Sequence, residues 1–349
     1  MKKKIVMICL LALSLLVAAC SNKEAEIEQQ SSKQKLTSDP DKIYVGFALD
    51  TLQQERWYKD KEHFEKTVQE LGGNVKTLAA NGDAEVQIRQ AELLIKEGVD
   101  VLVVVPSDSI AAGKIVELAH AANVKVISYD KLILNANVDY YVSFDNVKVG
   151  ELQAQYVVNE VKQGNIAYVG GDNSDNNAKL VKEGSFSVLQ PLIDNGSLKV
   201  VYDQQTDGWS GDVAKEQITQ YLKSGGVKFD GIVTGYDGLA EGALEAVGNL
   251  AGTIPVTGQD AELGALQRIV TGTQTMTVYK PIPLIAKSAA TLAMEVGKGT
   301  SPSTDIAINN GNLDVPSILL EPVAVTKDNI EETVVKDGHL TKEAIYEGK

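Results

Sequence analysis

The chain has 349 residues and a formal net charge of −14, with 44% hydrophobic and 23% charged residues. This length and composition are typical of a globular protein of about two domains. The acidic balance argues against a nucleic-acid surface, which needs clustered Lys and Arg, and no apolar run after residue 20 is long enough to span a bilayer.

The first twenty residues differ from the rest. Lys2, Lys3 and Lys4 precede an apolar run that is too short for a typical membrane helix, and small residues then lead to Cys20. This layout predicts a secretory signal peptide over residues 1–20. It also resembles the bacterial lipobox, which implies lipidation of Cys20 and a location on the outer face of the cell membrane. The alternative is ordinary cleavage near Ala19 with an incidental cysteine.

Cys9 and Cys20 are the only cysteines, and neither belongs to the expected folded part. We therefore expect no disulfide and no thiol chemistry there. Residues 21–41 are polar, charged and poor in aromatics, and they predict a disordered tether.

From Lys42 onward, short apolar runs alternate with helical patterns. Helices are expected around Trp57–Leu71, Ala84–Ile95 and Ile110–Ala122. The expected strands of this half are Ile43–Leu49, Val75–Leu78, Val101–Val105 and Val124–Tyr129. The third of these is apolar throughout, as a strand covered on both faces is. This alternation predicts a parallel sheet with right-handed crossovers.

The pattern starts again after Asp145. Its expected strands are Ile166–Val169, Leu198–Val201, Gly231–Thr234, Ile254–Thr257 and Gln274–Val278. A helix is expected from Pro281 to about Val296, and Ser317–Val325 is strand-like. The fold class is therefore α/β, with two doubly wound parallel-sheet domains.

Ligands of open α/β sheets bind outside the carboxyl ends of the strands. The polar and aromatic residues that follow the expected strands are Arg56, Trp57, Asp130, Lys131, Asp175, Asn177, Trp209, Tyr236, Asp237, Asp260 and Lys280.

These residue types suit a sugar, whose hydroxyls donate and accept hydrogen bonds and whose ring faces are nearly apolar. Each residue has a structural alternative. Trp57 is in phase with Phe64 and Leu71 and fits a core position, while Asp175 or Asp260 fits a helix N-cap. The number of such residues on both halves favours a ligand site.

Enzymatic interpretations have less support. His63, His120 and His339 have no second ligand at zinc spacing. No nucleophile elbow, Walker loop or dinucleotide-binding glycine motif follows a strand. We expect no catalytic residue, no metal and no cofactor, although two carboxylates of the site leave a glycosidase open.

At these residues the chain resembles the type I periplasmic sugar receptors, specifically the D-xylose-binding proteins of bacterial ABC transporters. The resemblance runs from Lys42 to about Gly338. It rests on the motifs Glu55-Arg56-Trp57, GVDVLVVVP (98–106), SFDNVKVGELQAQ (143–155), DNNAKL (175–180), DGW (207–209), GQDAEL (258–263) and GTQTMTVYKP (272–281).

The resemblance implies two domains joined by three crossover segments, with the sugar in the cleft between them and hinge closure on the ligand. The implied N-terminal sugar-binding domain comprises residues 42–145 and 279–310. The C-terminal one comprises residues 146–278 and 311–349.

The resemblance also implies roles for individual residues. The polar contacts to the sugar fall on Arg56, Asp130, Asp175, Asn177, Asp260 and Lys280, and the aromatic contacts on Trp57 and Trp209. Two positions depart from the family pattern. Lys131 replaces the usual Arg, so the bidentate hydrogen bonding of a guanidinium is lost. Tyr236 replaces the usual Asn.

Three functions fit these expectations. The first is a receptor that binds D-xylose and delivers it to an ABC permease. The second is a xylose sensor that docks on a membrane histidine kinase or chemoreceptor, and the third is the glycosidase. A DNA-binding repressor of this fold would need a helix-turn-helix before the first strand, where the signal and tether lie instead.

Overall fold

The computed structural model describes residues 35–304 and 306–347. The expected signal peptide, Cys20 and residues 21–34 of the expected tether lie outside the described residues. No helix among those described is both long and apolar enough to cross a membrane.

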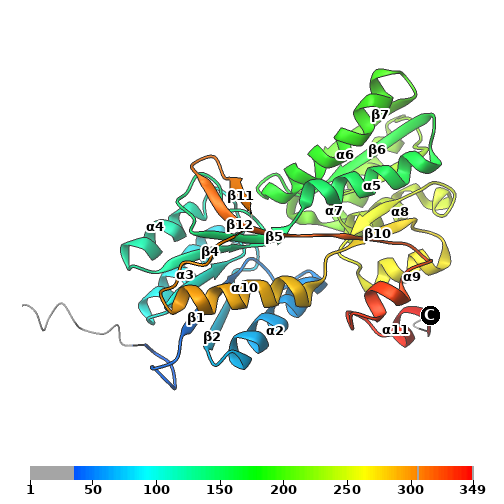
Figure 1. Ribbon diagram of the computed structural model, residues 1–349. Helices are drawn as coiled ribbons and strands as arrows, with labels where there is room; N and C mark the ends of the chain where they lie inside the picture. Colours follow the sequence, from blue (N-terminus) through cyan, green and yellow to red (C-terminus); the bar gives the residue numbers. More distant parts are fainter. Residues whose placement is uncertain (1–34, 305, 348–349) are drawn as a thin grey trace, which may run out of the picture.

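Two α/β domains lie side by side (Figure 1). The sheet of the first domain has the order β11-β12-β5-β4-β3-β1-β2. Its strands are β1 (Tyr44–Leu49), β2 (Asn74–Ala79), β3 (Val101–Val104), β4 (Lys125–Tyr129), β5 (Tyr140–Phe144), β11 (Ile306–Asn309) and β12 (Asp314–Leu320). All neighbours pair in parallel except β11 and β12, which confirms the expected parallel architecture.

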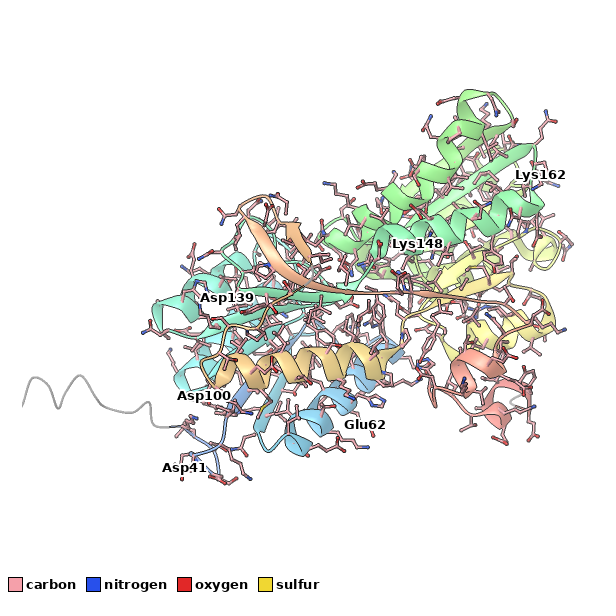
Figure 2. All side chains as sticks on the ribbon, viewed as in Figure 1. Asp41, Glu62, Asp100, Asp139, Lys148 and Lys162 are labelled. Carbon is pink, nitrogen blue, oxygen red and sulfur yellow. The ribbon has the colours of Figure 1, made fainter. Side chains whose placement is uncertain are left out.

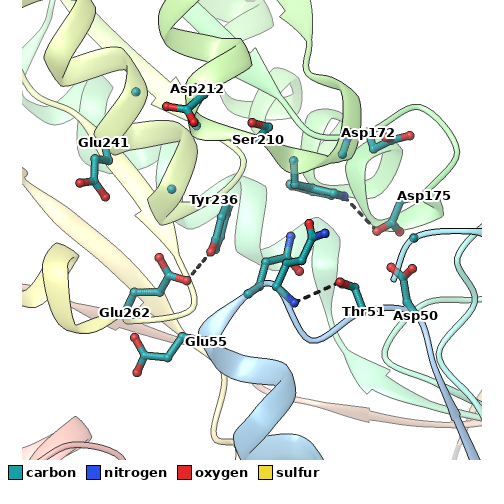
Figure 3. A pocket seen from close by; sticks show the side chains of 18 of the residues that line it. Asp50, Thr51, Glu55, Asp172, Asp175, Ser210, Asp212, Tyr236, Glu241 and Glu262 are labelled. Atoms are coloured by element: carbon teal, nitrogen blue, oxygen red, sulfur yellow. Dashed lines mark hydrogen bonds between the residues drawn. The ribbon is translucent and has the colours of Figure 1, made fainter. Parts of the chain in front are cut away.

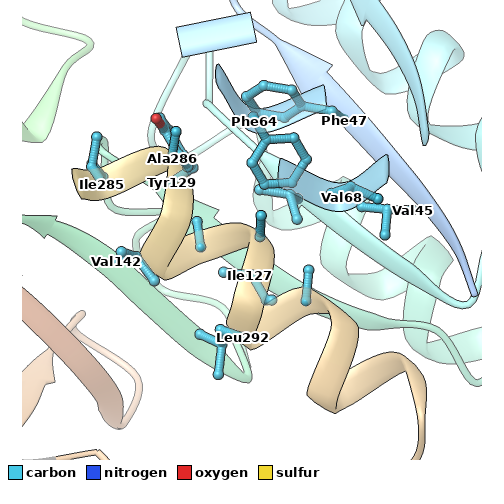
Figure 4. Packing of buried hydrophobic residues seen from close by; sticks show 14 of the residues in the cluster. Val45, Phe47, Phe64, Val68, Ile127, Tyr129, Val142, Ile285, Ala286 and Leu292 are labelled. Atoms are coloured by element: carbon cyan, nitrogen blue, oxygen red, sulfur yellow. The ribbon is translucent and has the colours of Figure 1, made fainter. Parts of the chain in front are cut away.

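Helices cover both faces of this sheet: α2 (Glu55–Glu70), α3 (Ala84–Lys96), α4 (Gly113–Ala121) and α10 (Ile282–Gly297). Strand β3 shows why the sheet has two cores. Val101 and Val103 face the cluster that contains α2 and α10, whereas Leu102 and Val104 face the cluster of α3 and α4. Figure 4 shows the first cluster, in which the rings of Phe47 and Phe64 lie 4.3 Å apart.

The second domain has two three-stranded sheets, β7-β6-β8 and β13-β10-β9, which an isolated parallel bridge between Ile232 and Val256 connects. Its strands are β6 (Gly164–Gly170), β7 (Leu198–Gln205), β8 (Gly231–Thr234), β9 (Thr257–Gln259), β10 (Met276–Tyr279) and β13 (Val323–Val325). Its α-helices are α5 (Asn146–Glu160), α6 (Asn176–Asp194), α7 (Gly211–Lys223), α8 (Asp237–Val247), α9 (Leu263–Thr271) and α11 (Lys342–Glu347). Short turns are η1 (Asp207–Trp209), η2 (Gly248–Leu250) and the π-helical η3 (Glu331–Val335).

Helices α5 and α6 pack closely because glycines lie at their contact. A Cβ on Gly184 would lie 1.9 Å from the carbonyl oxygen of Val147, and one on Gly150 would lie 2.0 Å from that of Val181. Both glycines therefore permit an approach of the two helix backbones that a larger residue prevents.

The chain passes between the domains three times: after β5, between β10 and α10, and between β12 and β13 (Figure 1). The first and third crossings touch, since the amide of Asp145 donates to the carbonyl of Leu320 at 3.0 Å. The three crossover segments agree with the expected fold class.

Three expectations need correction. The domain boundary at residue 310 is wrong, because β12 pairs in parallel with β5 and so extends the first domain to Leu320. The strand-like run Ser317–Val325 is two strands that belong to different domains. Strand β5 was not expected as a separate element at all.

The end of the expected tether is also ordered. Lys35 forms an ion pair with Asp100 at 2.6 Å, and the amide of Leu36 donates to the carbonyl of Glu97 at 2.8 Å. Residues 35–41 thus lie on the first domain, since local charge and backbone contacts compensate for their low hydrophobicity.

Charged side chains occupy the outer surface of both domains. Figure 2 labels Glu62 on the first domain and Lys148 and Lys162 on the second, and all three are exposed. The side chains of the candidate site lie instead between the domains.

Candidate functional site: a charged cavity between the domains

One cavity between the domains brings together all ten expected sugar-binding residues. They are Arg56, Trp57, Asp130, Lys131, Asp175, Asn177, Trp209, Tyr236, Asp260 and Lys280, and Gln54 and Gln259 complete the lining. Each follows the carboxyl end of a strand or begins the next helix, as the topology of parallel sheets requires.

Arg56 is the centre of the first-domain side. Its guanidinium is buried and lies 2.8 Å from Asp130, 3.2 Å from Asp60 and 3.4 Å from Asp260. Burial opposes its charge, but the three carboxylates together raise the pKa of Arg56 above its ordinary value. Asp60, which sequence reasoning missed, is fully buried and also accepts a hydrogen bond from the Tyr129 hydroxyl. It therefore orients Arg56 without lining the cavity.

Asp130 is held by its own backbone. Its φ is +59°, and its carbonyl accepts hydrogen bonds from Tyr141 at 3.0 Å and Ser143 at 2.6 Å. Burial raises its pKa, but Arg56, Lys280 and Lys131 outweigh burial and lower the pKa overall. The carboxylate is thus ionised and fixed in direction.

Asn177 reaches Asp130 from the second domain. Its side-chain nitrogen donates to Asp130 Oδ1 at 3.0 Å, and its oxygen accepts from Asn146 at 3.0 Å. Asn146 therefore fixes the orientation of the Asn177 amide.

Lys131 bridges the two domains. Its ammonium lies 2.7 Å from Asp50 and 3.1 Å from Asp175, and these carboxylates raise its pKa despite the opposing effect of burial. Asp175 combines two roles: it caps α6 by accepting from the amide of Asn177, and its Oδ2 faces Lys131. The helix-cap alternative is thus correct for Asp175 and compatible with a ligand role.

Asp260 does not cap a helix. It has a φ of +89°, and its Oδ1 lies 2.9 Å from Lys280 and 3.4 Å from Arg56. Lys280 lies in the second crossing and is buried. Asp260 and Lys280 therefore bring charges of opposite sign to the hinge side of the cavity.

The two tryptophans have different environments. Trp57 is only 2% exposed and belongs to the first core cluster, which agrees with its interpretation as a core residue. It also lines the cavity, and its contact with a sugar stays a prediction. Trp209 is half-buried, has a φ of +55°, and donates its indole N–H to Asp175 at 3.2 Å. Its ring fits over Gly171, where a Cβ would lie 2.2 Å from the indole. A glycine is therefore required beneath it.

Tyr236 lines the cavity with its ring, at 89° to the ring of Trp209, but its hydroxyl donates to Glu262. Burial, with the nearby charges of Asp260 and Glu55, raises the pKa of Glu262 to about 7. The sequence offered no signal for this pairing, because the two residues lie in different loops.

Gln259 was also missed. Its nitrogen donates to the carbonyl of Gly235 at 2.5 Å, whereas its oxygen is buried with no partner among the described residues. The expected strand ended at Thr257, although β9 extends to Gln259, and a longer strand would have placed this residue beside Asp260 at the site.

The cavity is narrow, with about 30 Å³ of free space, because its charged side chains pair directly with one another. It adjoins an outer cleft of about 630 Å³ (Figure 3). Within the described part of the chain no group of three His, Cys, Asp or Glu side chains could hold a metal ion.

The chain is similar to known proteins over most of its length. A family model described as a periplasmic binding protein domain matches residues 45–301. The chain is 46% identical to the D-xylose-binding periplasmic protein of Escherichia coli (strain K12), over 85% of this chain and 90% of that protein. It is 44% identical to the protein of the same name from Haemophilus influenzae, over 87% and 92%.

A solved structure is also similar. The solute-binding protein of an ABC transporter from Clostridium phytofermentans, with bound β-D-glucose, superimposes with a TM-score of 0.81 at 30% identity. The match covers 86% of this chain and 99% of that one.

Proposed function

Because this chain belongs to the periplasmic binding protein family, we propose that it is an extracytoplasmic receptor that binds D-xylose between its domains and delivers it to an ABC importer. The proposal assigns the protein a binding role and no catalysis. The observation that carries it is the cavity itself, where fixed charges from both domains and two tryptophans converge.

The charged groups match the hydroxyls of a sugar. Asp130, Asp175 and Asp260 accept hydrogen bonds, while Arg56, Lys131 and Lys280 donate them. In the cavity these groups already pair with one another, so their charges are balanced before a neutral ligand enters. A sugar hydroxyl that inserts into such a pair donates to the carboxylate and accepts from the cation, which replaces one charged hydrogen bond with two.

The pocket favours a pentose for steric reasons. A pentopyranose has no hydroxymethyl arm, and the ring of Tyr236 fills the space where the related receptors usually carry a smaller Asn. Tyr236 lines the cavity with its ring because Glu262 holds its hydroxyl away. A hexose would have to displace this buried aromatic ring.

Binding is proposed to close the two domains about the hinge. Direct contacts already join them: the amide of Ser109 donates to the carbonyl of Ser174 at 3.0 Å, and the Ser109 hydroxyl accepts from the amide of Asn176 at 3.1 Å. A ligand that contacts both sides stabilises this closed arrangement by its differential affinity for it.

The experiment that tests the ligand is calorimetry of the full chain with xylose, ribose, arabinose and glucose. We expect xylose to bind and glucose to bind far more weakly or not at all. The variant Tyr236→Asn should retain xylose binding, because it restores the residue usual in the family. Tighter binding of glucose or ribose than of xylose would contradict the assignment of xylose as the ligand. Glucose is the main alternative, because the similar solved structure contains bound β-D-glucose.

Anchoring through Cys20 is proposed from the sequence alone. A fatty-acid probe should label the wild-type chain expressed in bacteria and should not label Cys20→Ala. Equal labelling of the two forms would contradict the anchor.

The membrane partner is proposed to be a permease. Co-purification of a histidine kinase or chemoreceptor in its place would assign the sensor role instead.

A further inference from the structure

The outer cleft is a continuation of the inner cavity. Its volume is about 630 Å³, and both spaces share Gln54, Lys131, Asp175, Trp209 and Tyr236 in their linings. A ligand in the inner cavity therefore borders the outer cleft directly.

The charges of the residues that line the outer cleft limit the kinds of ligand that can bind there. Eight of its residues are carboxylates, and within the described chain its one cationic lining residue is Lys131. Negative charge of this density repels an anion. The carboxylates form no group that could hold a metal ion among the described residues. A neutral ligand rich in hydrogen-bond donors fits both facts.

Two side chains of the cleft have hydrogen-bonding capacity that the protein does not use. Asp50 is only 7% exposed; its Oδ2 accepts from Lys131 at 2.7 Å, whereas its Oδ1 is buried with no partner among the described residues. The hydroxyl of Ser107, which also lines the cleft, is likewise buried without a partner there. Buried polar atoms are normally satisfied, so an unpaired carboxylate oxygen at a cleft wall indicates a missing donor.

The shape of the cleft leaves room for a ring. Trp209 is half-buried and lies in both linings, and Gly82 and Gly208 lie where a Cβ would contact nothing within 4 Å. In Figure 3, Asp50 of the first domain faces Asp175 of the second, while Ser210 and Asp212 lie on the second-domain side of the cleft.

From these observations we infer that the outer cleft is a second subsite for a hydroxylated ring, so that the protein binds a xylose disaccharide with one ring in the inner cavity and one in the outer cleft. This inference rests on the proposed xylose-binding function. It adds that the physiological ligand class includes short oligosaccharides of pentoses.

The test compares xylose with its β-1,4-linked disaccharide by calorimetry of the full chain. We expect the disaccharide to bind about tenfold more tightly, which corresponds to one additional charged hydrogen bond. Asp212→Ala and Ser107→Ala each remove one polar group that lines the outer cleft and does not line the inner cavity. Both should weaken disaccharide binding and leave xylose binding unchanged.

Glu216→Ala is the matched control, since Glu216 lies one turn further along α7, is exposed, and is absent from the cleft lining. It should change neither affinity. Binding of xylose without binding of the disaccharide, or a disaccharide affinity that Asp212→Ala and Ser107→Ala do not change, would overturn the second subsite alone. Failure of both sugars to bind would contradict the proposed function itself.

Discussion

Trp209 is the residue whose replacement we expect to lower the affinity for the proposed ligand most. It lies on two glycines, since a Cβ on Gly171 or Gly235 would lie 2.2 or 3.1 Å from its ring. Its indole N–H is held by Asp175. The ring is thus fixed before any ligand arrives, and little conformational entropy remains to be lost on binding.

We predict that Trp209→Ala lowers xylose affinity by tenfold or more, because removal of an aromatic contact surface costs on the order of 1 kcal/mol or more. Trp209→Phe should retain a larger part of the affinity. Titration calorimetry measures both variants, and an unchanged affinity of Trp209→Ala would show that the ring does not contact the sugar.

Glu262 should make stability depend on pH. Its pKa is raised from 4.5 to about 7, chiefly by burial, so the protonated carboxyl is favoured in the folded state. The resulting stabilisation is fully present below about pH 4.5 and is lost as the pH rises through about 7. Glu262→Gln keeps an acceptor for the Tyr236 hydroxyl without this ionisation.

The free energy of unfolding of Glu262→Gln should therefore increase relative to wild type between pH 4.5 and 7.5, by on the order of 1–3 kcal/mol. Urea denaturation at several pH values measures this difference. A difference that stays constant with pH would contradict the raised pKa.

At the scale of elements, the contact of α5 with α6 depends on two glycines. Gly184→Ala should destabilise the protein by about 1–3 kcal/mol, because the added methyl group meets the backbone of Val147 and forces the helices apart. The gain in helix propensity from Ala is about 1 kcal/mol at most and does not offset this strain. Gly113→Ala is the control, since its Cβ would make an ordinary contact of 3.5 Å with Ala136. Equal stability of the two variants in thermal unfolding would argue against tight packing here.

Elements with a strong local pattern were predictable from the sequence. The run Val101–Val105 has no polar residue, and each of its residues is buried, so its interpretation as a strand covered on both faces needed no tertiary information. Helix α10 was equally clear, since Pro281 marks its start and its apolar residues recur at helical spacing.

Elements defined by tertiary contacts were not predictable. Strand β5 contains Ser143, a buried polar residue whose hydroxyl is satisfied by donating to the carbonyl of Asp130. The run Ser317–Val325 has one continuous pattern, and only pairing with β5 and then β10 divides it between two domains. The site followed the same rule. Strand ends located ten of the twelve residues that line the cavity, but the bond of Tyr236 to Glu262 depends on how two loops meet.

At the scale of the whole molecule, the domains are expected to move as two bodies about the three crossings. Small-angle scattering of the full chain should show a smaller radius of gyration with saturating xylose than without it. Trp209→Ala provides the control: at a xylose concentration that saturates the wild type but not this weaker-binding variant, its radius of gyration should decrease less. An unchanged radius for wild type at saturation would contradict closure on the ligand.

The three crossings also determine the order in which the protein can fold as it is made. The first 145 residues supply five strands of the first sheet, but α2 covers only part of the face that carries Val45 and Phe47, and α10, which covers the rest, begins at residue 282. The edge of β5 is paired by β12, which begins at residue 314. A chain that emerges from its N-terminus thus has a partly uncovered apolar sheet face until nearly all of the second domain has been synthesised. Completion of the first domain is therefore among the last events of folding, although its sequence comes first.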